Sequence, residues 1–277
     1  MVARILGAVL RGVLVALLIA MPSILLPHYT IRSGEMVALM ALLAALLTIA
    51  EYSSTFPSFV EFRDAPPINR MRFVSLFLIV LSLSLIAKHM YEPSNMTALF
   101  SGLGYLLGNL LDFPYSPVRL VLLVLPQNVP IEIVQTARAA AGVAYMFTLI
   151  TVLSFQFSIR VLNWPIANGA FNVWVNLPLF DPTTGGDVVH RLHRDGRINV
   201  MLGCLLPFAI PAFVKLAADI VDPALLIPPH TMIWTIAAWA FLPASMLMRG
   251  MAMLRIADLI EEKRRKAYAN SEAMQTA

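Results

Sequence analysis

The sequence is poor in charge. Only 13% of its 277 residues are charged, 59% are hydrophobic, and the mean hydropathy is +0.76. A soluble domain carries about 25% charged and about 45–50% apolar residues, because its surface must face water. These proportions exclude an ordinary soluble fold. They predict an all-α, polytopic α-helical integral membrane protein, with the lipid bilayer as its first partner.

The chain is also nearly without cysteine. Its single cysteine, Cys204, excludes an internal disulfide and a cysteine metal cluster, and we interpret it as a small buried hydrophobe. No basic stripe interleaved with aromatic residues is present, so the net charge of +4 does not indicate a nucleic-acid partner. Repeats and low-complexity tracts are absent, and residues 1–277 are predicted to form one transmembrane domain.

Six apolar runs are long enough, or nearly so, to cross a bilayer, which takes about 20 helical residues. They are residues 12–27, 35–50, 73–88, 139–159, 199–221 and 230–249. A further apolar region, 96–130, is interrupted by glycines and prolines, and its run 118–126 is too short to cross. We predict that this region forms a re-entrant or interfacial hairpin; a full span with an interfacial piece is the alternative.

Lysine and arginine are distributed unevenly between the connecting segments. Segments 51–72, 160–198 and 249–277 hold three, four and six of them, whereas 28–34, 88–95 and 222–229 hold one, one and none. The positive-inside rule then predicts about six transmembrane helices with both termini cytoplasmic. Loops 51–72 and 160–198 and the tail 250–277 are expected on the cytoplasmic side. We expect a multi-pass protein of a bacterial inner membrane.

The longest polar interruption, residues 171–199, holds the densest cluster of arginine, histidine and aspartate. Gly185 and Gly186 follow two threonines, but the lysine and spacing of a phosphate-binding Walker loop are missing. A turn before a helix with Asp187 as its N-cap is the simpler interpretation. His190 and His193 would share one helix face, yet no established zinc signature accompanies them.

We favour contact with lipid headgroups or with a protein partner for the basic residues of the two loops. The residues expected to make it are His190, Arg191, His193, Arg194, Arg197, Arg63 and Arg70. An ion pair between Glu61 or Asp64 and Arg191 or Arg194 would join the two loops.

Three histidines fall at the outer ends of predicted spans: His28, His89 and His230. If their helices are neighbours, they form a candidate ligand cluster for a metal or haem, although histidine is also common at interfaces. No catalytic residue and no cofactor can be assigned from the sequence, and no metal site is predicted with a complete ligand set.

The apolar runs contain no charge near their middles, which disfavours ion-coupled transport. The leading hypothesis is a non-enzymatic accessory, assembly or scaffolding component of a larger membrane complex, including a homo-oligomer. A small-solute transporter or channel built on proline-broken helices is the first alternative. It would need Asn109, Thr148, Thr151 and Gln156 to converge. A membrane enzyme that unites His190, His193, Asp187 and Glu61 at the cytoplasmic face is the second.

Overall fold

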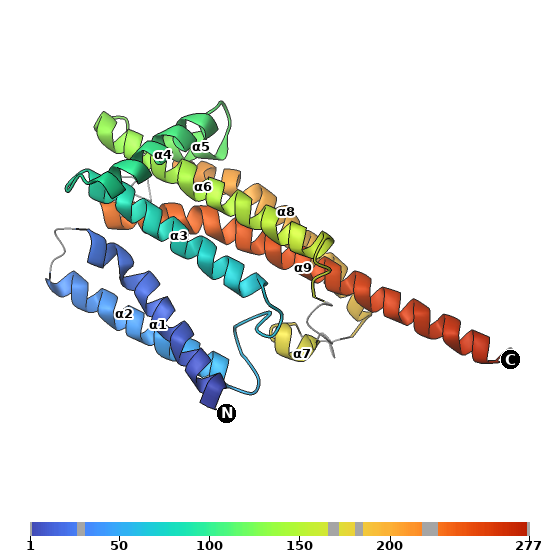
Figure 1. The fold of residues 1–277 in the computed structure, drawn as a ribbon. Coiled ribbons are helices and arrows are strands. Elements are labelled where there is room, and N and C mark those ends of the chain that lie inside the picture. The colour runs from blue at the N-terminus through green and yellow to red at the C-terminus, as the bar shows by residue number, and fades with distance from the viewer. Residues whose placement is uncertain (1, 27–30, 166–171, 181–184, 218–226, 276–277) are drawn as a thin grey trace.

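The computed structural model describes residues 2–26, 31–165, 172–180, 185–217 and 227–275, and its regular elements in these ranges are all helices (Figure 1). The helices are α1 (Val2–Leu25), α2 (Ile31–Ser53), α3 (Ile68–His89), α4 (Asn95–Leu111), α5 (Pro117–Val124), α6 (Ile131–Arg160), α7 (Val173–Asn176), α8 (Val188–Leu216) and α9 (Pro229–Gln275). Six of them, α1, α2, α3, α6, α8 and α9, are long and apolar enough to cross a membrane. These six match the six apolar runs of the sequence.

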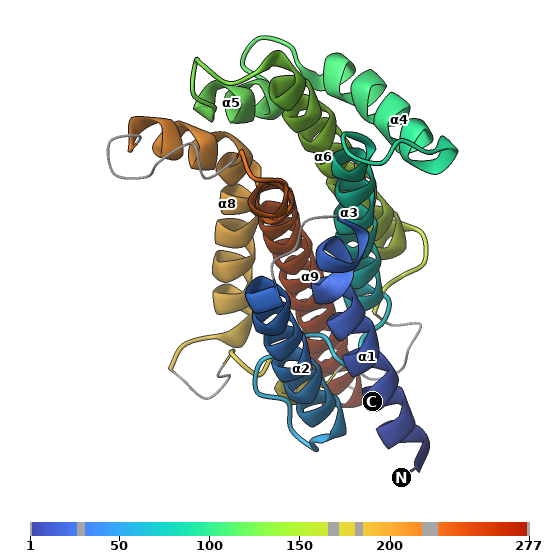
Figure 2. The same cartoon turned by 90° about the vertical axis from the view of Figure 1, so that its left-hand side faces the viewer.

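Helices α3, α6, α8 and α9 form a bundle, and the α1–α2 hairpin lies beside it with α1 against α3 (Figures 1 and 2). Helix α1 begins and α9 ends at the same end of the bundle (Figures 1 and 2). We call this the basic end, because the described parts of the arginine-rich segments 51–72 and 160–198 lie there. Helices α4 and α5 lie at the opposite end. The location of the termini in the cytoplasm stays a prediction.

Helix α4 begins with a capping box. The Ser94 hydroxyl accepts the backbone N–H of Thr97, and the Thr97 hydroxyl accepts that of Ser94. Because α3 ends and α6 begins at the opposite end, the segment 96–130 starts and finishes on one side (Figure 2). Its outward face is apolar, with Leu103, Leu106 and Leu110 each at least half exposed. That this segment forms a re-entrant or interfacial hairpin in a bilayer stays a prediction.

Small residues bring α4 into close contact with α6. A Cβ atom added to Gly142 would lie 2.5 Å from the Cα of Gly108, and one added to Gly108 would lie 2.8 Å from the Arg138 carbonyl oxygen. Gly104 packs on Ala139 in the same way. The spacing of Gly104 and Gly108 is the small-residue pattern by which membrane helices approach closely.

The prolines inside two of the bundle helices leave them continuous. Helix α8 runs through Pro207 and Pro211, and α9 runs through Pro243. The Pro207 carbonyl accepts a hydrogen bond of 2.9 Å from the indole N–H of Trp239, which replaces a partner within its own helix. Helices broken at these prolines, on which the transporter alternative depended, are therefore not seen. Cys204 is exposed on α8, so the expectation that it is buried was wrong.

Two hydrophobic cores succeed each other along the bundle. The larger core joins α3, α6 and α9 and consists mainly of leucine, isoleucine and alanine. The second core lies at the basic end and is built around Phe62, Phe155, Trp164 and Leu192, with Met253 from α9. The loops 51–72 and 160–198 are thus anchored on a core of their own, and this core positions the candidate site.

Candidate functional site

Trp164 is the centre of the second core and is only 2% exposed. Its ring meets Phe62 and Phe155 edge-on, with centroids 6.1 and 5.2 Å away. Its indole N–H donates to the carbonyl oxygens of Ala65 and Pro66 at 3.2 and 3.1 Å. Trp164, which belongs to the second loop, therefore binds the backbone of the first loop. The described parts of the two arginine-rich loops pack together as one platform at the basic end.

Asn176 of α7 joins the two loops a second time. Its side-chain oxygen accepts the Asp64 backbone N–H at 3.0 Å, and its carbonyl oxygen accepts the Phe62 N–H at 2.6 Å. Its side-chain amide donates to the Asn172 carbonyl at 3.0 Å. The predicted contact between the two loops is present, but an amide and an indole make it. The expected ion pairs are replaced, because Asp64 pairs with Arg63 at 3.3 Å and Glu61 pairs with α9.

Glu61 is 9% exposed, and both of its carboxylate oxygens accept hydrogen bonds from Arg249 of α9 at 2.6 and 2.8 Å. Arg72 of α3 lies beside this pair and donates to the Ser245 carbonyl on α9 at 2.9 Å. Its guanidinium stands over the Phe62 ring at 5.9 Å. Two cations and one carboxylate thus tie α3, the first loop and α9 together where the loops meet the bundle.

The C-terminal end of α2 is closed by the loop that follows it. The Glu51 carboxylate accepts the backbone N–H groups of Ser58, Phe59 and Val60 at 2.9–3.2 Å. Arg63 donates to the carbonyl oxygens of Glu51, Ser54 and Thr55. These bonds satisfy carbonyls that a helix end leaves without partners. Arg63 was predicted to contact headgroups or a partner. In the structure its guanidinium binds backbone carbonyl oxygens at the end of α2 and in the loop that follows.

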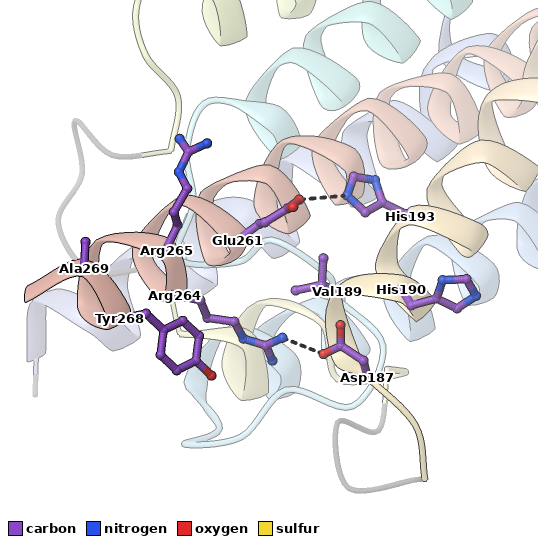
Figure 3. A pocket seen from close by; sticks show the side chains of 9 residues that line it. All are labelled: Asp187, Val189, His190, His193, Glu261, Arg264, Arg265, Tyr268 and Ala269. Carbon is purple, nitrogen blue, oxygen red and sulfur yellow. Dashed lines mark hydrogen bonds and ion pairs between the residues drawn. The ribbon is translucent and has the colours of Figure 1, made fainter. Parts of the chain in front are cut away.

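A groove of about 740 Å³ separates the first turns of α8 from the last turns of α9 (Figure 3). Arg264 donates to Asp187 at 2.6 Å across it. His193 lies 3.7 Å from Asp258 and 4.0 Å from Glu261, whereas the His190 ring points away from Glu261 (Figure 3). The hydrogen bond from Arg264 lowers the pKa of the Asp187 carboxyl below its ordinary value of 3.8. The groove is open, and both acidic and basic side chains line it.

The outward face of α8 changes from basic to apolar along the helix. His190, Arg194 and Arg197 are exposed at positions i, i+4 and i+7, which share one face. Exposed apolar residues follow on that side of the helix, among them Met201 and Leu205. This order is typical of a helix that passes from the headgroup region into the hydrocarbon. That these three residues contact headgroups or a partner stays a prediction. Their exposure on one face of α8 is compatible with it.

The other predicted contact residues have different surroundings. Arg70 is exposed in the first turn of α3. Arg191 is half-buried and stands over the Phe180 ring at 4.7 Å. His193 faces the carboxylates of α9 and is not part of the outward face. The seven basic residues are therefore divided between at least three environments and do not form one continuous surface.

The predicted histidine cluster is described only in part. His28 lies outside the described residues. The His89 ring nitrogen Nδ1 is 3.0 Å from the Thr97 hydroxyl, and His230 is half-buried at the start of α9. Across the ranges that the structure describes, no group of three or more His, Cys, Asp and Glu side chains is placed to hold a metal. The metal or haem site stays a prediction. His89 does not support it, because its Nδ1 atom is engaged by the Thr97 hydroxyl.

An ion triad at the opposite end was not anticipated from the sequence. The buried Asp112 carboxylate, at the C-terminal end of α4, lies 2.7 Å from Nε of Arg119 and 2.9 Å from Nε of Arg138. It joins α4, α5 and α6. A signal was available, because Asp112 and Arg119 are the only charged residues of the apolar region 96–130. Isolated opposite charges in such a region are expected to pair.

Comparison of the chain with protein-family models, with curated proteins and with solved structures finds no match in any of the three.

Proposed function

We propose that this protein is a non-enzymatic, polytopic membrane protein that acts as an accessory, assembly or scaffolding component of a larger membrane complex. The observation that carries the proposal is α9. It runs as one helix for 47 residues and continues for 26 residues beyond Arg249. At 1.5 Å per residue this extension is about 39 Å long. We place the extension and both loops in the cytoplasm of a bacterial cell, beneath the inner membrane.

The extension is anchored at its base and exposed at its end. Met253, Ile256 and Ala257 are buried in the second core. From Lys263 to Ser271 every residue is exposed. A helix that is polar all round typically bridges to another structure, because it buries no apolar stripe of its own. An anchored base with an exposed polar arm, joined to the start of α8 by the Arg264–Asp187 pair, suits contact with a partner.

The polar groups of the spans support this proposal over the transporter alternative. Thr148 and Thr151 donate to carbonyl oxygens of their own helix at 2.8 and 2.7 Å. Asn109 is exposed on α4 at the opposite end, and Gln156 lies near the basic end of α6 in a groove with Arg160 and Arg255. These four residues do not converge on one cavity.

The residues required by the enzyme alternative have separate partners. Glu61 binds Arg249, Asp187 binds Arg264, and His193 faces Asp258 and Glu261. A catalytic base needs hydrogen-bond reach to a shared substrate position. Carboxylates that are each engaged by a different arginine on α9 suit a structural role.

The hairpin of α1 and α2 offers a surface for a partner inside the membrane. Helix α2 packs chiefly against α1. Only 11% of the most apolar 18-residue stretch within Gly34–Ser53 is buried. Its free surface carries Leu39, Leu43 and Leu46, each at least half exposed. In a bilayer, lipid or another helix covers such a surface. We assign part of it to a neighbouring membrane protein or to a second copy of this chain.

The test is site-specific photocrosslinking in native membranes. A photoreactive residue in place of Tyr268 probes the α9 arm, and one in place of Phe113 at the opposite end is the control; their side chains are 68% and 55% exposed. We expect one stoichiometric crosslinked membrane protein from position 268 and none from position 113. A chain that crosslinks to nothing from position 268 and purifies alone would contradict the proposal and favour transport.

A further inference from the structure

A second groove, of about 630 Å³, lies at the basic end between the start of α1 and the end of α2. Its charged lining consists of Arg4 and Arg11 from α1, with Arg63 and Asp64 from the first loop. Tyr52, on the last turn of α2, completes its polar wall. The groove shares no lining residue with the α8–α9 groove, and it lies between the α1–α2 hairpin, the first loop and Val175 of α7.

The charges of this groove do not balance. Asp64 is its one acidic side chain, and it is engaged by Arg63. Arg4 donates to the carbonyl oxygens of Tyr52 and Ser54, and Arg11 donates to the Gly7 carbonyl at 2.7 Å. Carbonyl groups accept hydrogen bonds but do not neutralise a cation. Within the part of the chain that the structure describes, neither Arg4 nor Arg11 forms an ion pair with a carboxylate.

Arg11 lies on a surface that the bilayer must cover. Its neighbours on α1, Leu10 and Val13, are 59% and 57% exposed, and α1 is one of the six apolar spans. A cation on such a surface turns toward the headgroups. Arg11 does so, because its guanidinium reaches back one turn to Gly7 and stands 4.6 Å from the centre of the Tyr52 ring. Arg4 lies two turns closer to the N-terminus on the same side.

We propose that this groove binds the phosphate group of an anionic phospholipid, with Arg4 and Arg11 as the phosphate-binding residues. Two arginines without carboxylates match a phosphate oxyanion, which accepts charge-assisted hydrogen bonds from guanidinium groups. The lipid's acyl chains run along the exposed leucine and valine side chains of α1. The Arg63 guanidinium is already bonded to the carbonyl oxygens of Glu51, Ser54 and Thr55, so Arg63 contributes only its charge to the groove.

The surroundings favour a lipid over a soluble phosphate compound. The groove opens beside an apolar helix surface, so a ligand with acyl chains gains burial that a soluble ion cannot. Phe56 and Phe59, in the loop that follows Tyr52, are 72% and 74% exposed. Aromatic side chains at this level anchor a protein in the interfacial layer. The inference goes beyond the proposed function, since it holds whichever protein the α9 arm contacts.

The test measures lipid binding to the full-length protein in mild detergent by native mass spectrometry and by thermal unfolding. Phosphatidylglycerol is titrated against phosphatidylcholine of the same chain length. The probe variant is Arg4→Gln with Arg11→Gln, and the control is Lys263→Gln with Arg265→Gln, which removes two charges from the exposed end of α9.

We expect the wild type and the control to bind phosphatidylglycerol preferentially. The probe variant should bind it roughly 25-fold more weakly, since each cation near an anionic surface contributes a factor of about five. Equal loss in the control, or unchanged binding in the probe variant, would overturn the proposal. So would competition by inorganic phosphate or glycerol 3-phosphate at millimolar concentration, which would identify a soluble ligand.

Arg4 also holds the end of α2, so the double variant could lose binding through misfolding. Arg11→Gln alone leaves the hydrogen bonds of Arg4 to the end of α2 in place, because the hydrogen bond of Arg11 is to its own helix. It removes one cation–π contact with the Tyr52 ring, which contributes about 0.5–1 kcal/mol at an exposed site. We expect this variant to stay folded, with a small fall in unfolding temperature without lipid, and to lose about fivefold in affinity for phosphatidylglycerol. Arg11→Lys keeps the cation and should retain the preference. A single variant that binds like wild type would contradict a role for Arg11.

Discussion

Arg249 on α9 meets Glu61 in the first loop through two hydrogen bonds, and 188 residues separate them in the sequence. The Glu61 carboxylate is nearly buried, and Arg72 supplies a second cation beside it. Removal of the carboxylate would leave two guanidinium groups facing each other in a poorly hydrated place. This ion pair is therefore the principal polar link between the loop platform and the bundle.

Glu61→Gln is expected to lower the free energy of unfolding by about 2–4 kcal/mol, because it leaves buried charge uncompensated. Chemical unfolding in mixed micelles measures the change. Glu92→Gln is the matched control: Glu92 pairs with Lys88 at 3.0 Å, but its side chain is 56% exposed. An exposed pair contributes about 0–1 kcal/mol. Equal effects of the two substitutions would show that the Glu61 pair is not a special link.

Gly108→Ala should destabilise the contact between α4 and α6. The added Cβ atom would lie 2.8 Å from the Arg138 carbonyl oxygen, which belongs to the backbone and cannot move aside without shifting α6. Overpacking of this kind costs about 1–3 kcal/mol. Gly102→Ala on the same helix meets no atom within 4 Å and is the control. A thermal shift in Gly102→Ala as large as in Gly108→Ala would refute the close contact.

Asn176→Ala should loosen the first loop from α7. The substitution leaves the Asp64 backbone N–H and the Asn172 carbonyl without the partners that Asn176 provides, at a cost of about 1–3 kcal/mol. Limited proteolysis of segment 51–72 reports the loosening directly. Asn109→Ala removes an exposed amide from α4 and should leave the cleavage rate unchanged. Faster cleavage in both variants would point to a general loss of stability.

Much of the fold follows from hydropathy and charge. The six long apolar helices were predicted, because a long apolar run has few ways to bury its backbone except as a helix. The start of α8 next to Asp187 was predicted because aspartate is a favoured N-cap residue. Segment 96–130 was recognised as irregular because glycines and prolines interrupt it and its run 118–126 is shorter than the roughly 20 residues that a span needs.

The candidate site could be predicted only in outline. That the two arginine-rich loops meet was anticipated, but the pairing of Glu61 with Arg249 depends on how α3 and α9 pack, which a single sequence does not encode locally. The role of Trp164 was hidden for the same reason: an indole near a loop fits membrane anchoring as well as a loop core. Contacts between residues far apart in the sequence, such as these two, can be identified only when the packing of the helices is known.

The predicted topology can be checked by cysteine accessibility after Cys204→Ala. Tyr268→Cys on the α9 arm and Tyr115→Cys between α4 and α5 place thiols at side chains that are 68% and 86% exposed. A membrane-impermeant maleimide added to spheroplasts is expected to label position 115. Position 268 should react only after the membrane is opened, because the positive-inside rule puts the arm in the cytoplasm. The reverse pattern would invert the topology.

The α9 arm should detach from α8 at low pH. Arg264 lowers the pKa of Asp187 below 3.8, so the pair supports docking above that value and is lost as the pH falls through the lowered pKa. Spin labels at His190 and Tyr268 would report a constant distance from neutral pH to about pH 4 and a longer, broader distribution below it. Asp187→Asn should give the broad distribution at neutral pH as well. Glu262→Gln is the control, because the Glu262 carboxylate binds Lys266 of its own helix at 2.6 Å. A distance that does not change in Asp187→Asn would show that the second core alone holds the arm, and the Asp187–Arg264 pair would then be a surface contact without consequence for docking.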